Sequence, residues 1–169
     1  MSFLVFLNQS PAYSNLMALV RILVDGYSLL HQWPDLAPGR PRHSLAAREE
    51  LISRLTQYHD ASGTPITIIF DGATGPVADF PSSPEVEILY SRTGQTADQI
   101  IERVTHRLKH YGEVLVVTDD LAERDTVTSA GGMTSSCLNF IKLVESALSD
   151  LDREISNYNR REREKFKQH

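Results

Sequence analysis

The chain of 169 residues is long enough for one ordinary domain and too short for two well-formed ones. Hydrophobic residues make up 41% of it and charged residues 23%, and its one cysteine, Cys137, excludes a scaffold held by disulfides within the chain. The 22 acidic residues outnumber the 17 basic ones, so the net charge of −5 excludes binding of nucleic acid through overall charge alone. Any such binding would need a local basic patch or a metal ion.

The first 17 residues are interpreted as an N-terminal extension. Their apolar run, Phe3 to Leu7, has no positive charge before it and is a poor signal peptide, too short to span a bilayer. Met17 stands directly before the first convincing strand, which leaves two alternatives. Either translation starts at Met17 and residues 1–16 are not native, or these residues form an edge strand or an arm.

Short apolar runs alternate with segments of helical period along the rest of the chain. The first run, Val20 to Val24, predicts a buried strand that ends in a turn at an Asp-Gly pair. A loop rich in Pro, His and Arg follows from His31 to His43, and Ser44 can then cap a helix that Gly63 closes. The next run, Ile66 to Phe70, predicts a second buried strand before another Asp-Gly pair.

The second half of the chain continues the alternation. A proline-rich loop precedes a third strand, Val86 to Tyr90, and Thr96 with Gln99 has the capping-box pattern that starts a helix at about residue 97. A fourth strand, Val114 to Val117, comes next. The apolar residues after it step by three and four along one seam of a long C-terminal helix: Ile141, Val144, Leu148, Leu151, Ile155 and Tyr158.

Strands that alternate with helices predict a parallel sheet with helices on both faces, because a parallel strand pair needs a crossover. We therefore expect a three-layer, doubly wound α/β domain over residues 18–150 and a charged helical tail over residues 151–169.

Aspartates stand where the predicted strands end. Those that follow the first, second and fourth strands are Asp25, Asp71, and Asp119 with Asp120. Each alone is more often a turn or helix-cap residue, but the carboxyl ends of parallel strands share one edge, and Asp98 opens the next helix toward it. Crowded carboxylates need a counterion, and oxygen ligands suit Mg²⁺ or Mn²⁺. The sequence thus predicts a divalent-metal site at this edge.

Four segments stand in a characteristic order and spacing: Val24 to Leu30, Ile69 to Gly72, Thr96 to Arg103, and Val116 to Asp120. Together they resemble the NYN-domain ribonucleases, and within them the YacP-like branch of bacterial and plastid relatives of PIN-domain nucleases. The resemblance implies a PIN-like sheet with strand order 3-2-1-4-5. It also implies metal-dependent endonucleolytic cleavage of RNA, in the cytoplasm or, in a plant, the plastid stroma.

Carried over position by position, the resemblance assigns four catalytic acids. Asp25, Asp98 and Asp120 match metal ligands, and Asp71 matches an acid that ligates the metal or orients a ligand. Where the family tends to have serine, this chain has Asp119, a further candidate ligand. The expected reaction is hydrolysis of a phosphodiester in single-stranded RNA, mRNA among the candidates, by water that the metal activates.

Hydroxyl side chains stand close in sequence to these acids. Ser28, where the family usually has the longer asparagine, is expected to hydrogen-bond and orient a carboxylate, as are Thr96 and Thr118.

The loop after the first strand is the candidate RNA clamp. We expect Trp33 to stack on a base and Arg40 and Arg42 to contact phosphate, with Arg92 also touching the RNA backbone. The alternative is that Trp33 packs in the core, as tryptophan usually does, while the arginines face solvent.

The last twelve residues, 158–169, carry five basic and two acidic side chains. This segment is either a contact for RNA or a ribosomal surface, or a solvated helix end. The competing function for the whole chain is a catalytically silent RNA- or ribosome-binding module. Loss of one or more of the acids would indicate such a module, and here the acids are present. No membrane partner is expected, and the sequence predicts no oligomeric state.

Overall fold

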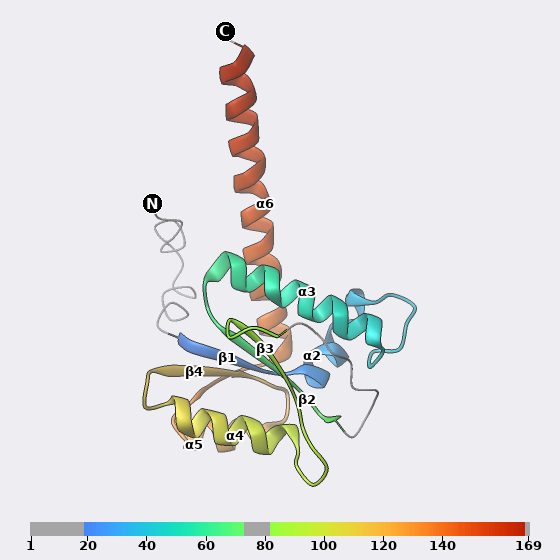
Figure 1. Cartoon of the computed structure of the whole chain (residues 1–169), viewed down its shortest axis with the longest axis vertical. Coiled ribbons are helices and arrows are strands. Elements are labelled where there is room, and N and C mark those ends of the chain that lie inside the picture. The colour runs from blue at the N-terminus through green and yellow to red at the C-terminus, as the bar shows by residue number, and fades with distance from the viewer. Residues whose placement is uncertain (1–18, 73–81, 168–169) are drawn as a thin grey trace.

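The computed structural model describes residues 19–72 and 82–167 (Figure 1). Its strands are β1 (Leu19–Asp25), β2 (Ile66–Phe70), β3 (Val86–Tyr90), β4 (Glu113–Val117) and β5 (Met133–Ser135). Its helices are α2 (Gly26–Gln32), α3 (Leu45–Ser62), α4 (Ala97–Leu108), α5 (Leu121–Ser129) and α6 (Cys137–Lys167), with a short 3-10 turn at Pro34–Leu36. The predicted N-terminal extension and the alternative start at Met17 lie outside the described residues.

The five strands form one parallel sheet in the order β3-β2-β1-β4-β5. This confirms the three-layer, doubly wound α/β fold and the strand order that the resemblance implied. The fifth strand has only three residues, all half-buried, so it was too short to show a period in the sequence. It pairs with β4 from Leu115↔Met133 to Val117↔Ser135.

Successive residues of each strand pack on opposite faces of the sheet, as the period of two requires. In β1, Ile22 and Val24 join the core beneath α2, α3 and α6, whereas Leu23 joins the smaller core beneath α4 and α5. Figure 1 shows α3 on one side of the sheet and α4 with α5 on the other. Both faces are covered, which explains why the strands are continuous apolar runs and show no alternation.

Local capping sets the helix ends that the sequence predicted. The Ser44 side chain accepts from Ala47 N at the start of α3, and Gly63 closes that helix with a left-handed φ of 73°. The capping box at the start of α4 is present in full. Two helices were not predicted from the sequence. Helix α2 occupies the expected turn after β1, and α5 is the next element after β4.

Helix α6 is continuous across the boundary at residue 150 that the sequence suggested, and it has two different halves. Its first half packs Phe140, Ile141 and Val144 against the sheet and the helices beside it. Its second half, residues 152–167, projects away from the domain; we call it the stalk (Figure 1). Within the described part of the chain, no helix has the length and apolar character needed to cross a bilayer.

Candidate metal site

Three carboxylates from distant parts of the chain meet at the carboxyl edge of the sheet. Asp25, Asp98 and Glu123 each offer one oxygen, and these oxygens all lie within 4.8 Å of one another. They come from the end of β1, the first turn of α4 and the first turn of α5. The sheet topology causes the meeting, because β1 and β4 are adjacent and the helices that follow parallel strands start at the same edge.

Asp25 is held in place by the start of α2. Its Oδ1 accepts from the Ser28 backbone N at 3.3 Å, and its Oδ2 accepts from the Ser28 hydroxyl at 2.9 Å. Only glycine fits at position 26, between Asp25 and Ser28, since a Cβ there would lie 2.4 Å from the buried Phe70 ring. Burial raises the pKa of Asp25; the Ser28 hydrogen bonds lower it in part, and the charges of Asp98 and Asp120 raise it further.

Glu123 is the deepest member of the group, with 6% of its surface exposed. Among residues 19–72 and 82–167, no group lies in good hydrogen-bond geometry to either of its carboxylate oxygens, although the Thr118 hydroxyl is near enough to lower the pKa somewhat. Burial, together with the charges of Asp98, Asp25 and Asp120, raises the pKa of Glu123 to about 8. A buried, unpaired carboxylate of this kind holds a proton at neutral pH unless a cation takes its place.

Asp98 is more exposed and borders open space. Partial burial of its carboxyl and then the nearby charge of Asp120 raise its pKa; the adjacent Glu123 carboxyl lowers it in part, and Asp71 adds a smaller upward effect. A cleft of about 150 Å³ lies next to it, lined by Asp98, Glu102, Ala122, Glu123, Thr126 and Val127. About 10–15 Å³ of such space holds one water, so the cleft has room for several waters beside Asp98.

The other predicted acids lie beside the group and have structural partners. Asp120 Oδ1 accepts from the backbone N of Ala122 and Glu123 at 2.9 and 3.2 Å, which caps α5. Asp119 Oδ1 accepts from Cys137 N at 2.9 Å and so ties the start of α6 to the end of β4. Asp71 Oδ1 accepts from the Ser91 hydroxyl at 2.8 Å.

The converging set therefore differs from the one that the sequence predicted. Glu123 stands in it, whereas Asp120 and Asp119 do not. A signal for Glu123 was present, since Asp120 and Glu123 have the spacing of an N-cap and a third helical residue. In a capping box that Glu would turn back to the cap residue; here its side chain turns inward, and Asp120 N bonds Thr118 Oγ1 instead.

The three hydroxyl residues are engaged differently. Ser28 donates to Asp25, as described above. Thr118 accepts from Asp120 N at 3.2 Å. Thr96 accepts from Gln99 N at 3.3 Å and belongs to the capping box of α4, so its hydroxyl bonds to backbone and not to a carboxylate.

The position of Trp33 contradicts its predicted role in the RNA clamp. Only 3% of its surface is exposed, and it packs in the core beneath α3 with the Arg54 guanidinium 5.8 Å from the ring centre. A ring buried in this way has no free face for a base, so the alternative interpretation of Trp33 is the correct one. Arg40 and Arg42 are exposed, although Arg42 Nη1 donates to the His31 carbonyl at 2.7 Å; Arg92 is exposed before α4.

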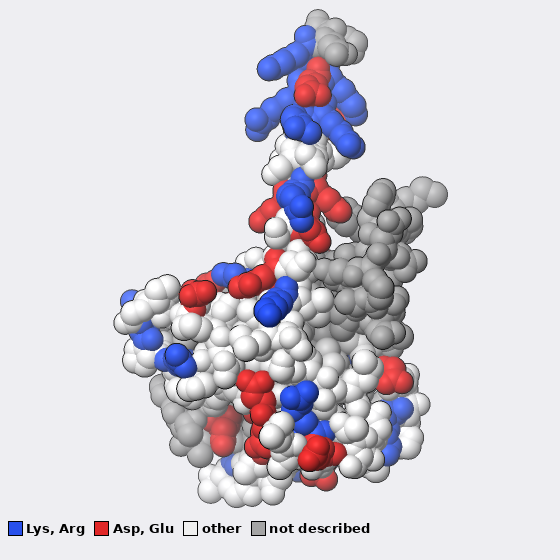
Figure 2. All heavy atoms as spheres, turned by 180° about the vertical axis from the view of Figure 1, so that it is seen from behind, with Lys and Arg blue, Asp and Glu red and all other residues white. Residues whose placement is uncertain are grey.

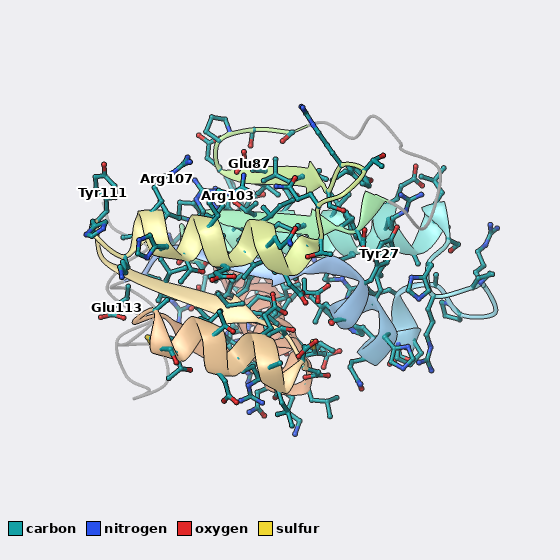
Figure 3. All side chains as sticks on the ribbon, turned by 90° about the horizontal axis from the view of Figure 1, so that it is seen from below. Tyr27, Glu87, Arg103, Arg107, Tyr111 and Glu113 are labelled. Atoms are coloured by element: carbon teal, nitrogen blue, oxygen red, sulfur yellow. The ribbon has the colours of Figure 1, made fainter. Side chains whose placement is uncertain are left out.

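A row of aromatic rings lies at the same edge of the sheet and was not recognised in the sequence. Tyr27 meets His43 at 4.7 Å and Phe70 at 5.2 Å between ring centres, and Tyr90 stacks on Phe70 at 5.5 Å. Tyr27 is half-buried and His43 exposed, so the row keeps an accessible end. Figure 3 shows Tyr27 at the opposite end of the sheet from Glu113.

Comparison with known proteins agrees with this architecture. A family model described as the YacP-like NYN domain matches residues 22–169. The chain belongs to the YacP-like NYN family. Its similarity to the uncharacterized protein YacP of Bacillus subtilis (strain 168) is 24% identity over 136 residues, which cover 79% of this chain and 80% of that protein.

Solved structures of the B. subtilis protein Rae1 (YacP) have the same fold. The crystal structure of a single-residue mutant of Rae1 matches with a TM-score of 0.72 and covers 83% of this YacP-like chain and 84% of that chain. A second Rae1 (YacP) crystal structure matches with a TM-score of 0.69 over 80% and 79%. Both are 24% identical to this chain, and the NYN family to which it belongs has a nuclease-like fold.

Proposed function

We propose that this YacP-like NYN protein is a divalent-metal-dependent endoribonuclease that hydrolyses phosphodiester bonds in single-stranded RNA, mRNA included. The observation that supports it most is the meeting of Asp25, Asp98 and Glu123 oxygens within 4.8 Å at the carboxyl edge of the sheet. Membership of a family with a nuclease-like fold supports it independently.

The donor set suits a hard cation such as Mg²⁺ or Mn²⁺. All three candidate ligands are carboxylates, and Glu123 brings buried oxygens with no partner in the described part of the chain. When bound, such an ion would act as a Lewis acid toward a phosphodiester and would lower the pKa of a water. Asp120 and Asp71 lie near enough to add negative charge that strengthens cation binding.

The chain's own residues prepare this site. Ser28 fixes both oxygens of Asp25, so that ligand needs little reorganisation. Asp120 caps α5 and thereby sets the turn that carries Glu123. The cleft between α4 and α5 leaves space for water next to Asp98.

RNA contacts are proposed around the same edge. Arg40 and Arg92 are exposed cations for phosphate, and Arg42 keeps donors beyond the one it gives to His31. The Tyr27 ring, with His43 against it, is the proposed stacking surface for a base in place of the buried Trp33.

Circular single-stranded RNA tests the proposal, because it has no ends and only an endonuclease can open it. The full-length chain should linearise and then fragment this RNA with Mn²⁺ or Mg²⁺ and leave it intact with EDTA. Binding of Mn²⁺ to the protein without RNA, measured by titration calorimetry, gives a second readout. Intact circles despite tight Mn²⁺ binding would favour the catalytically silent RNA-binding module.

Glu123→Gln is the most informative variant, since it keeps the shape of the side chain and removes its ability to ionise and hold a cation. We expect it to lose cleavage and to weaken Mn²⁺ binding. Glu113→Gln is the matched control, because Glu113 is exposed at the opposite end of the sheet (Figure 3). Unchanged Mn²⁺ binding in Glu123→Gln would reject this group as the metal site.

A further inference from the structure

The stalk carries an apolar face that no described part of the chain covers. Ile155, Tyr158 and Phe166 are 48%, 64% and 81% exposed, although Ile155 and Tyr158 continue the seam that is buried nearer the domain. Side chains of this size on a projecting helix are typical of a helix that packs against a partner.

The same helix is charged in two blocks of opposite sign. Residues 145–154 hold four acidic and one basic residue, a net charge of −3, whereas residues 160–167 hold five basic and two acidic, a net charge of +3. Figure 2 shows acidic side chains around the base of the stalk and basic ones around its tip. A second copy of this helix, turned end for end, would match both blocks at once.

We propose that two copies of this chain associate by pairing their stalks side by side in antiparallel orientation. The apolar residues repeat every three and four positions, which is the a and d pattern of a coiled coil. In the stalk Ile155 occupies an a position and Tyr158 a d position; Leu148 and Leu151 continue the same pattern toward the domain, where Leu148 packs against the core of its own copy. Antiparallel helices pair a with d, so Ile155 packs on Tyr158 of the second copy and Tyr158 on its Ile155.

The charges that flank this seam select the antiparallel arrangement. Glu154 and Arg161 both occupy g positions, and g faces g in an antiparallel pair. Glu154 of each copy therefore faces Arg161 of the other, which gives two such pairs in the dimer. A parallel pair would set Glu154 against Asn159 and bring the two basic tips together.

Both g residues are available for such a contact. Within the described residues, the ion pairs of the stalk use Arg153 with Asp150 and Lys165 with Glu162. Glu154 and Arg161 have no ion-pair partner in this part of the chain. The seam is only about two heptads long, so the dimer is expected to be weak and sensitive to salt.

Sedimentation equilibrium of the full-length chain over a range of concentrations tests the proposal. The wild type should dimerise, and added salt should weaken the dimer. Glu154→Lys and Arg161→Glu should each raise the dissociation constant about tenfold, since two exposed pairs become repulsive. Combining the two substitutions exchanges the charges and should restore the wild-type constant.

Glu164→Lys is the matched control, because it makes the same charge change at a c position that faces away from the seam. It should leave the dissociation constant near the wild-type value, and circular dichroism should show full helix in every variant. A wild type that is monomeric throughout would overturn the proposal. So would a double variant as weak as the singles.

Two other occupants of the stalk would also be recognised and would overturn the proposal. If removal of residues 1–16 is needed before any dimer forms, those residues cover the face in the full chain. If the chain stays monomeric and Arg161→Glu weakens RNA binding, the basic tip contacts RNA.

Discussion

The carboxyl edge of the sheet and the stalk of α6 both concentrate charged side chains, but in opposite ways. At the edge the charges have one sign and are partly buried, and the pKa values of Asp25, Asp98 and Glu123 are all raised. Along the stalk both signs are exposed to solvent, with acidic residues concentrated near the domain and basic ones near the tip, and neighbours such as Lys165 and Glu162 pair within the helix. At the edge, burial and crowding make the ionised carboxylates unfavourable unless a cation binds. On the stalk, the charges are exposed and can contact a partner.

The largest expected effect is at the edge. Asp25→Asn should lower the rate of Mn²⁺-dependent RNA cleavage at least about a thousandfold, roughly 4 kcal/mol of transition-state stabilisation, because a candidate ligand loses its charge. Ser28→Ala removes only the hydroxyl that orients Asp25 and should cost about 10- to 100-fold. Initial rates under single-turnover conditions measure both. Equal losses would contradict the distinction between ligand and orienting residue.

The free energy of unfolding should depend on pH through Glu123. Its pKa is about 8 in the folded protein and near 4.5 in the unfolded chain, so between these values the unfolded chain has released a proton that the folded protein still holds. Stability of the metal-free protein should therefore fall as pH rises from about 4.5 to about 8.

Urea unfolding at several pH values checks this dependence. Glu123→Gln should flatten the profile, and Glu164→Gln on the stalk should not. Saturating Mn²⁺ should reverse the trend, since the cation stabilises the ionised carboxylates. A wild-type profile that stays flat in the absence of metal would count against the buried carboxylate as its source.

A moderate effect is expected from the aromatic row. Tyr27→Leu should weaken binding of single-stranded RNA by about 1–3 kcal/mol, because one base loses its stacking surface. Trp33→Phe keeps an aromatic ring in the core and should leave RNA affinity unchanged. Fluorescence anisotropy with a short labelled RNA measures both, and the reverse ranking would return the base contact to Trp33.

The smallest effect belongs to the stalk. Lys165→Ala removes a solvent-exposed ion pair with Glu162 and should leave the free energy of unfolding unchanged within the error of the measurement. Thermal unfolding followed by circular dichroism suffices for this comparison. A larger loss would mean that the stalk ion pairs stabilise the domain itself.

Most of the fold could be predicted because its signals are local. The apolar runs of β1 and β2, the Ser44 cap and the Thr96 capping box all depend on residues next to one another in the chain. The elements that were missed have weak local signals: β5 has three residues, and α2 begins at Gly26 within an Asp-Gly pair that usually indicates a turn.

Part of the candidate site was also within reach of the chain's pattern alone. Acids at strand ends and helix starts lie at one edge of any parallel sheet, so the presence of Asp25 and Asp98 there follows from order and spacing. Which carboxylates converge is a different matter. Asp120 and Glu123 stand three residues apart in one turn, yet one caps the helix in solvent and the other turns inward. That choice depends on how α5 packs beside α4 and β1, and no local pattern contains this information.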